Sequence, residues 1–328
     1  MFPSSRIVCL TEETVETLYL LGEQDRIVGI SGYVVRRPQA RREKPRVSAF
    51  TSATNIDKIL ALNPDLVLTF SDLHLQADIA AHLVRRGLDA QAFNQRSVAG
   101  ILDMVRMVGA MVKASERADR LVARLEGGLV QARSRAERLP RRPKVFFEEW
   151  DDPLISGIGW VSELIEVAGG VGIFADRARQ GAARDRVVTI DEVVAAREQD
   201  LIIGSGCGKK FRPERVMARP DFGRTPAVQQ QDLYEIKSSL ILQPGPAALT
   251  DGLAELQNIT ERWAVKTREN SSMGARLNEV LEALPLQGPI GGIPKNGYPP
   301  LLEAWYTTDQ LRVTIANRLL HHPYRCPD

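Results

Sequence analysis

The chain carries the same succession of local patterns twice, and this repetition constrains its fold more than any other feature. Residues 55–68 read as a short helix that leads into an apolar strand, and residues 189–203 repeat this order. Each helix opens with a residue type that caps helix starts, Asn55 in the first copy and Thr189 in the second. A short apolar run of this kind is typical of a parallel strand that is buried on both faces.

A second pair of patterns precedes each copy. Residues 6–10 predict a strand, and residues 15–21 predict a helix that ends at Gly22. The same order recurs between residues 144 and 168, where the helix ends at Gly169. Glycine just past the last turn is the usual left-handed end of a helix. Strands that alternate with helices in both halves predict an α/β protein with two Rossmann-like, parallel-sheet lobes.

The segment between the two halves predicts the connection between the lobes. Residues 97–139 carry apolar side chains at helical spacing and almost no proline, with a break near residues 113–115. The second of the two predicted helices is roughly 24 residues and about 36 Å long. We therefore expect one long helix to join the lobes and to restrict hinge motion between them.

These patterns predict four parts in the chain. An N-terminal α/β lobe covers residues 1–114, a linking helix covers 115–140, and a C-terminal α/β lobe covers 141–264. Residues 265–328 lie outside the repeat and read as a tail of unknown role, with a Pro/Gly-rich linker and short elements such as a helix at 277–284.

Composition argues against several classes of function. The net charge of +2 gives no reason to expect nucleic acid, and no apolar run approaches the roughly 18 residues of a membrane span. The start lacks the pattern of an export signal, so we expect a cytoplasmic monomer as written, or a periplasmic one if a signal is missing from this chain. Three cysteines without CxxC spacing and four histidines argue against a disulfide framework or a bare metal site.

With these segments in place, the chain resembles the helical-backbone (class III) substrate-binding proteins of ABC importers, which carry cobalamin, haem and iron–siderophores. The resemblance covers residues 6–264 and is closest to the cobalamin-binding branch. It implies a ligand cleft between the lobes, cobalamin or a related metal chelate as ligand, no intrinsic cofactor, no catalysis, no membrane insertion and an association with ABC-type uptake. The strings that carry it are VGISGY at 28–33, PQA at 38–40, ALNPDLV at 61–67, SG at 156–157 and LIEVAGG at 164–170.

In parallel α/β lobes, ligands bind beyond the carboxyl ends of the strands. In the first lobe this rule selects the loops at 10–14, 31–37, 50–54 and 70–74. Tyr33 and Phe70 stand at predicted strand ends, and the resemblance implies that they cover the face of a macrocycle. Aromatic side chains offer the wide, stiff apolar surface that this requires; plugging the strand end is the alternative for each.

The same rule selects residues 148–160 in the second lobe, where acids surround a tryptophan. We expect Trp150 and Trp160 to close on the ligand, and Glu149 and Asp151 to accept hydrogen bonds from its amide or hydroxyl groups. A solvated acidic loop is the alternative interpretation.

The remaining selected loop, residues 204–212, is glycine-rich and basic. It departs from the Walker phosphate-loop pattern, but its backbone N–H groups and cations favour an anion such as a ligand phosphate or carboxylate. The candidates here are Cys207, Lys209, Phe211 and Arg212. Cys207 is either a metal ligand or a packing residue. In the first lobe, His74 is either an axial ligand to a chelated metal or polar surface.

The resemblance also implies one acidic residue on each lobe that docks onto arginines of a permease. Asp191 falls at the second-lobe position, but Gln76 stands at the first, and glutamine lacks the charge that an arginine selects. Coupling to a permease is therefore in question. The alternatives are a haem or iron–siderophore binder, a cytosolic corrinoid- or tetrapyrrole-handling enzyme, and an interaction protein that has lost the cleft. The scarcity of histidine and the lack of a nucleophile–base arrangement argue against the enzyme.

Overall fold

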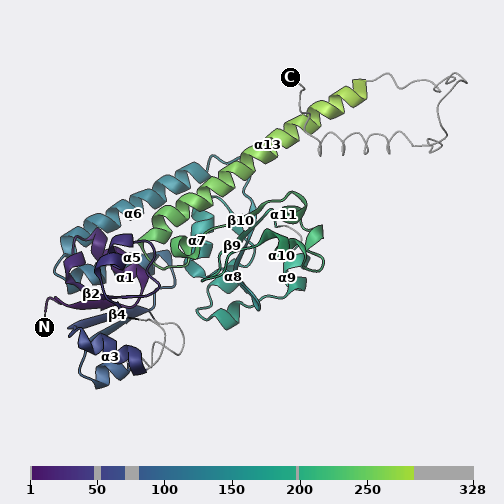
Figure 1. The fold of residues 1–328 in the computed structure, drawn as a ribbon. Coiled ribbons are helices and arrows are strands. Elements are labelled where there is room, and N and C mark those ends of the chain that lie inside the picture. The colour runs from purple at the N-terminus through teal and green to yellow at the C-terminus, as the bar shows by residue number, and fades with distance from the viewer. Residues whose placement is uncertain (1, 48–52, 71–80, 197–198, 284–328) are drawn as a thin grey trace, which may run out of the picture. The chain divides into compact units, whose positions relative to one another are not determined.

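The computed structural model describes residues 2–47, 53–70, 81–196 and 199–283. By its internal contacts the chain divides into two units, Met1–Ala264 and Val265–Asp328. The first unit contains two separate sheets with helices around each of them (Figure 1). The prediction of two α/β lobes with parallel sheets is confirmed.

The first lobe is a parallel sheet with helices on both faces. Its strands are β1 (Ile7–Cys9), β2 (Ile27–Ser31), β3 (Arg46–Val47), β4 (Leu66–Phe70) and β5 (Ala90–Phe93). Its helices are α1 (Glu12–Leu20), α2 (Pro38–Glu43), α3 (Ala53–Ala61) and α5 (Val98–Met111). The strand order is β3-β2-β1-β4-β5, with β1 in the middle. Ile7 and Cys9 pack in the cluster that contains α1 and α5, whereas Val8 packs with Ile59 of α3, because successive strand side chains point to opposite faces.

The second lobe is also mainly parallel. Its strands are β6 (Lys144–Asp151), β7 (Leu154–Ser156), β8 (Val171–Gly172), β9 (Leu201–Gly204) and β10 (Leu233–Glu235). Its helices are α7 (Gly159–Val167), α8 (Ala175–Ala178), α9 (Ile190–Ala195), α10 (Pro213–Met217), α11 (Pro226–Gln229) and α12 (Ser238–Ile241). The order is β10-β9-β6-β7, and β8 also pairs with β6.

One strand pair in this lobe corrects the prediction of a loop that begins at Glu148. β6 continues to Asp151 and then turns back into β7, which runs antiparallel to it. The turn falls at Asp152 and Pro153, where proline has no N–H to give to a ladder. The acidic stretch is therefore the end of a strand and a hairpin.

A single long helix carries the chain from the first lobe to the second, as predicted. This helix, α6 (Ser115–Ala136), lies beside the start of α13 (Leu253–Ala283), where Gln257 Nε2 donates to Ala132 O at 3.4 Å (Figure 1). The chain reaches α13 through the helical turn η4 (Ala248–Gly252). Because α13 continues to Ala283, residues 265–283 are helical, which corrects the prediction of only a short helix in the tail.

The helix ends follow the sequence signals in most places. Gly22 and Gly169 adopt the predicted left-handed conformation, with φ of 71° and 90°. Thr189 caps α9 and forms a reciprocal capping box with Glu192. Asn55 does not cap α3, because that helix begins two residues earlier, at Ala53.

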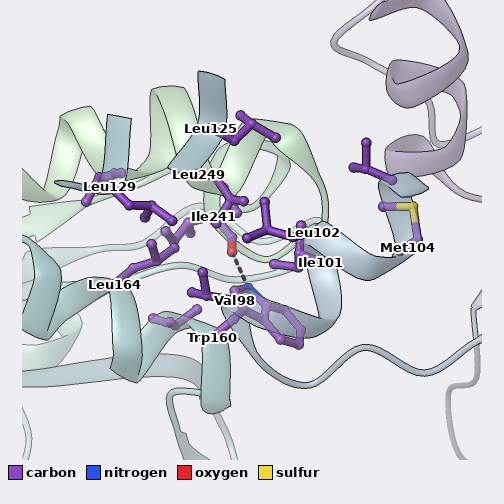
Figure 2. Packing of buried hydrophobic residues seen from close by; sticks show 14 of the residues in the cluster. Val98, Ile101, Leu102, Met104, Leu125, Leu129, Trp160, Leu164, Ile241 and Leu249 are labelled. Carbon is purple, nitrogen blue, oxygen red and sulfur yellow. Dashed lines mark hydrogen bonds between the residues drawn. The ribbon is translucent and has the colours of Figure 1, made fainter. Parts of the chain in front are cut away.

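An apolar core runs from the first lobe into the second (Figure 2). Trp160 of α7 packs there with Val98 and Ile101 of α5, is 3% exposed, and donates from Nε1 to Ile241 O at 2.8 Å. This placement corrects the prediction that Trp160 closes on a ligand, because its ring and its N–H are both used inside the core.

Candidate functional site

The first lobe presents exposed apolar side chains at the carboxyl end of β2. Tyr33 is 63% exposed and Val35 is 48% exposed, and both lie in the loop that follows the strand. Large apolar side chains grouped at a strand end in an α/β lobe form a surface that a ligand can cover. Tyr33 therefore lies where the sequence predicted.

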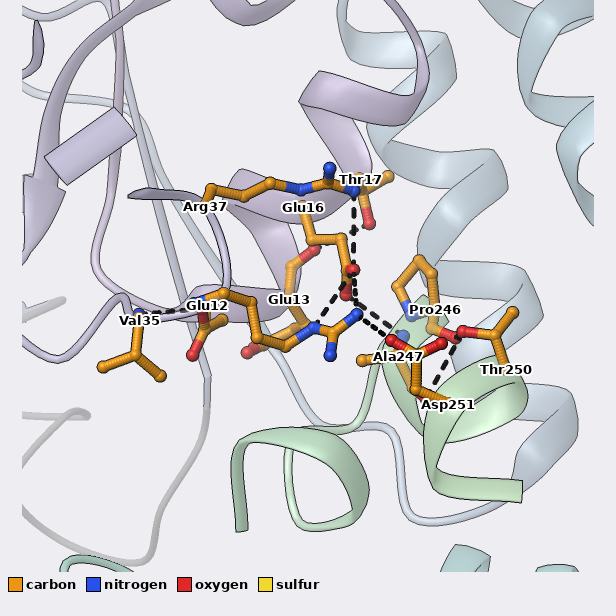
Figure 3. A network of polar contacts seen from close by, with 11 residues as sticks. Glu12, Glu13, Glu16, Thr17, Val35, Arg37, Pro246, Ala247, Thr250 and Asp251 are labelled. Atoms are coloured by element: carbon orange, nitrogen blue, oxygen red, sulfur yellow. Dashed lines mark hydrogen bonds and ion pairs between the residues drawn. The ribbon is translucent and has the colours of Figure 1, made fainter. Parts of the chain in front are cut away.

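A buried carboxylate fixes the loop that carries these side chains (Figure 3). Glu12, the first residue of α1, is 4% exposed, and its Oε1 accepts from the backbone N of Val35 at 2.9 Å and from the backbone N of Arg36. Arg36 in turn donates to Glu16 of α1 at 3.1 Å and to Asp251 of η4 at 2.6 Å. The loop is held from α1 and from η4.

Phe70 ends β4 and is half-buried. Its ring packs against the main core, and the guanidinium carbon of Arg96 lies 4.7 Å from the ring centroid. Phe70 thus plugs the strand end and also stands beside a cation, in a geometry typical of cation–π contacts. His74 and Gln76 lie outside the described residues.

A small pocket opens in the second lobe at the carboxyl ends of β6 and β9. Its enclosed space is about 30 Å³, room for about two waters. It brings together most of the second-lobe residues that the sequence predicted, and adds several that it missed. The lining residues are Glu148, Glu149, Trp150, Asp151, Ser205, Gly206, Lys209, Lys210, Phe211, Arg212, Arg215, Val216 and Arg219.

The carboxylates of this pocket pair with cations of their own lobe. Glu149 accepts from both terminal nitrogens of the buried Arg186, at 2.6 and 3.0 Å. Glu148 accepts in the same two-pronged way from Arg219, at 2.5 and 2.9 Å. Such paired hydrogen bonds are the strong form of an arginine–carboxylate contact. Glu148 and Glu149 therefore mainly stabilise the lobe. Only the lone pairs that do not accept from an arginine are left for other hydrogen bonds.

Lys209 ties the hairpin to the glycine-rich loop. Its Nζ donates to Asp151 Oδ1 at 2.6 Å and lies 4.4 Å from the ring centroid of Trp150. The hydrogen bond from Lys209 lowers the pKa of Asp151. Trp150 is half-buried, and its Nε1 donates to Asp152 O at 2.9 Å. The indole is thus held at the rim of the pocket.

Phe211 forms the floor of the pocket because the loop folds back over Gly204. Phe211 is 8% exposed, and its backbone N donates to Glu235 Oε1 at 3.0 Å. A Cβ at Gly204 would lie only 1.8 Å from the Phe211 ring. Only glycine fits at the end of β9 while the ring stays in place.

Replacing Gly204 with alanine is therefore expected to displace Phe211 and lower the free energy of unfolding by about 1–3 kcal/mol, the usual cost of overpacking a core. Urea denaturation of the purified variant measures this change. Gly223→Ala is the matched control, because a Cβ there would meet no atom within 4 Å. Equal stability of the two variants would mean that Phe211 does not rest on Gly204.

The other predicted residues lie at the surface. Cys207 and Arg212 are exposed on the loop between β9 and α10, and Asp191 is exposed in the first turn of α9. Within the described part of the chain, no group of three or more His, Cys, Asp or Glu side chains is arranged to hold a metal ion. No helix in that part combines the length and apolarity needed to cross a membrane.

The segment that follows β5 in the first lobe contacts the second lobe. The Val98 N–H, after β5, donates to Glu163 Oε2 of α7 at 2.9 Å. A Cβ at Gly159, which starts α7, would lie 2.3 Å from Arg96 O. Gln95 Nε2 donates to Pro244 O at 2.8 Å. The segment after β5 in the first lobe is therefore in direct contact with α7 and with the stretch after α12 in the second lobe.

Comparisons with known proteins agree with this fold. Residues 7–240 match the model of the family described as periplasmic binding protein. The chain is 25% identical over 263 residues to the uncharacterized ABC transporter substrate-binding lipoprotein YvrC of Bacillus subtilis (strain 168), covering 76% of this chain and 78% of that one. It is 26% identical over 255 residues to a vitamin B12-binding protein of Vibrio cholerae serotype O1, covering 76% of this chain and 86% of the relative.

Among solved structures, the periplasmic heme-binding protein RhuT from Roseiflexus sp. RS-1, in apo form, superposes with a TM-score of 0.66 at 24% identity. The match covers 78% of this chain and 99% of that one. At this identity the likeness concerns the fold.

Proposed function

The chain belongs to the periplasmic binding protein family, and from this premise we propose that it binds a metal chelate between its lobes without transforming it. Relatives of the family carry the names of vitamin B12-binding and heme-binding proteins, which supports a flat, metal-containing ligand. Cobalamin is the first candidate, and haem or an iron–siderophore is the alternative within the same class.

The contact between the segment that follows β5 and the second lobe is the observation that carries this proposal. Ligands of parallel α/β lobes bind beyond the carboxyl ends of the strands, and here the segment beyond β5 contacts the segment beyond β10 and α12 through Gln95 and Pro244. Tyr33 on the first lobe and Trp150 on the second supply aromatic surface. A ligand bound there would meet stiff apolar faces from one lobe and a polar pocket from the other.

The proposal includes delivery to an ABC-type permease, because family relatives are named as ABC transporter substrate-binding proteins. Asp191 is exposed in α9, where an arginine of a partner can reach it. The first-lobe counterpart, Gln76, lies outside the described residues. Asp191→Asn should weaken association with such a permease while leaving chelate binding unchanged.

Titration of the purified protein with four chelates tests the proposal. The probes are cyanocobalamin, dicyanocobinamide, haemin and ferrichrome, followed by their absorbance and by tryptophan fluorescence. We expect saturable binding of at least one probe at one ligand per chain, and recovery of that ligand unchanged. Conversion of a bound chelate would instead support the enzyme alternative. The absence of binding to all four would contradict the proposal.

The first-lobe face gives a specific prediction. Tyr33→Ala is expected to weaken binding of the chelate about tenfold or more, because an aromatic residue at a ligand-covered surface contributes more than about 1.4 kcal/mol when truncated. Val130→Ala is the matched control, since Val130 is a 59% exposed apolar residue of α6, away from the strand ends. Unchanged affinity in Tyr33→Ala would show that this loop is not part of the binding site.

A further inference from the structure

The second-lobe pocket contains a buried hydroxyl group that makes no hydrogen bond to the described residues. Ser205, the first residue after β9, is 1% exposed and lines the pocket. Its backbone N donates to Glu148 O at 2.9 Å, which fixes the residue in place. Its hydroxyl has no hydrogen-bond partner among the described residues. Because buried hydroxyl groups in folded proteins nearly always have a partner, this one is positioned for a partner that comes from outside the chain.

The pocket also carries an excess of positive charge. Five cationic and three acidic residues line it. The acids are already neutralised by Arg219, Arg186 and Lys209. Lys210 and Arg212 are exposed and form no ion pair with any described residue. The local field therefore favours a negatively charged group.

The size of the pocket limits what enters it. Its enclosed space of about 30 Å³ accepts a small polar group but not the body of a macrocycle, which needs hundreds of Å³. The pocket therefore fits a substituent of a larger ligand that lies outside it.

We propose that this pocket is a subsite for an oxyanion carried by the ligand, in which the Ser205 hydroxyl donates one hydrogen bond and Lys210 and Arg212 provide the opposing charge. The inference rests on the proposed function and narrows it: the chelate carries a carboxylate or a phosphate. Charge-assisted hydrogen bonds to such a group are stronger than those to an amide, so the subsite selects chelates that carry an oxyanion over chelates that lack one.

Two matched pairs of probes separate the two kinds of oxyanion. Haemin carries two carboxylates that its dimethyl ester lacks, and cyanocobalamin carries a phosphodiester that dicyanocobinamide lacks. We expect the oxyanion-bearing member of at least one pair to bind the wild type at least tenfold more tightly than its partner. Preference for haemin over its ester assigns a carboxylate; preference for cyanocobalamin over cobinamide, which also lacks the nucleoside, assigns a phosphate where the pocket variants below reduce it.

Three variants connect that preference to the pocket. Ser205→Ala, Lys210→Gln and Arg212→Gln should each reduce the preference at least threefold and leave the affinity for the member without the oxyanion unchanged. Ser205→Ala should fold normally, because the hydroxyl it removes has no hydrogen-bond partner among the residues that the structure describes. Arg135→Gln, an exposed arginine of α6, is the charge-matched control and should bind as the wild type does.

The outcomes distinguish this inference from the proposed function. Equal affinities within each pair that binds, or binding of uncharged ferrichrome alone, would overturn the oxyanion subsite and leave chelate binding intact. A preference that survives in all three variants would place the anion elsewhere. Failure of every probe to bind would contradict the proposed function itself.

Discussion

Replacing Trp160 with alanine is expected to lower the free energy of unfolding by about 3–5 kcal/mol, the range for removing a large aromatic ring from a well-packed core. Trp160 is 3% exposed and lies in the core shared by the two lobes, against Val98 and Ile101 (Figure 2). Its N–H also satisfies Ile241 O at 2.8 Å. The free energy of unfolding therefore falls for two reasons: the substitution leaves a cavity, and the carbonyl group of Ile241 loses its donor. Urea or thermal denaturation measures it.

Two controls separate the contributions of the ring and of the hydrogen bond. Trp160→Phe keeps most of the ring but loses the N–H, and should cost only about 1–2 kcal/mol. Trp150→Ala, at a half-buried position on the pocket rim, should cost less than half as much as Trp160→Ala. If Trp150→Ala destabilised the protein as strongly, the assignment of Trp160 to the core and of Trp150 to the rim would be wrong.

Glu13→Gln is expected to change how stability depends on pH. Glu13, in the first turn of α1, is 1% exposed, and its Oε1 has no hydrogen-bond partner among the described residues. Burial, with smaller contributions from the charges of Glu12 and Glu16, raises its pKa to about 7. Gly245 is packed against this side chain, since a Cβ there would lie 2.3 Å from the Glu13 Cβ.

The direction of the pH effect follows from the raised pKa. The folded protein holds this proton more tightly than the unfolded chain, so the stabilisation is complete below the ordinary glutamate pKa and is lost as the pH rises through about 7. Between pH 5 and pH 8 the wild type should lose about 2–3 kcal/mol relative to Glu13→Gln, which cannot ionise. Urea denaturation at several pH values measures this difference. Glu116→Gln, a highly exposed control on α6, should follow the wild-type curve. Parallel curves for Glu13→Gln and wild type would show that Glu13 does not titrate in this range.

Much of the fold could be predicted because its determinants are local in the sequence. The repeated strand–helix patterns predicted both lobes, and the glycines at 22 and 169 marked helix ends that the structure places in the left-handed conformation. Helical spacing of apolar residues predicted α6 nearly to its bounds. These features depend on neighbours along the chain, which a sequence displays directly.

The sequence predictions were wrong where contacts between residues far apart in the chain determine the structure. The strand pairing of Trp150 with Ile155 extends β6 beyond Glu148, and an acidic run gives no signal for that pairing. Trp160 reads as an exposed aromatic near a strand end, but its place depends on α5, more than fifty residues earlier. Strand and helix patterns do not report which faces meet across lobes.

The candidate site was predicted as a set of loops, but not as individual contacts. The rule of strand ends selected the loop that contains Ser205 and Lys210, yet Ser205 was not chosen from it and Lys210 was counted only among the cations of the loop. Attention to the first residue after β9 could have found Ser205, because that position lies at the carboxyl edge of the sheet. The ion pairs of Glu148 and Glu149 with Arg219 and Arg186 could not be predicted, because the partners are 71 and 37 residues away.

Hydrogen–deuterium exchange tests most directly whether one ligand engages both lobes. Exchange is compared for the protein alone and for the protein saturated with the chelate probe that binds most tightly. We expect slower exchange in residues 31–37 of the first lobe and in residues 205–212 of the second, both at the same ligand concentration. Protection confined to one of these loops, or found only at other surfaces, would contradict a binding site shared by the two lobes.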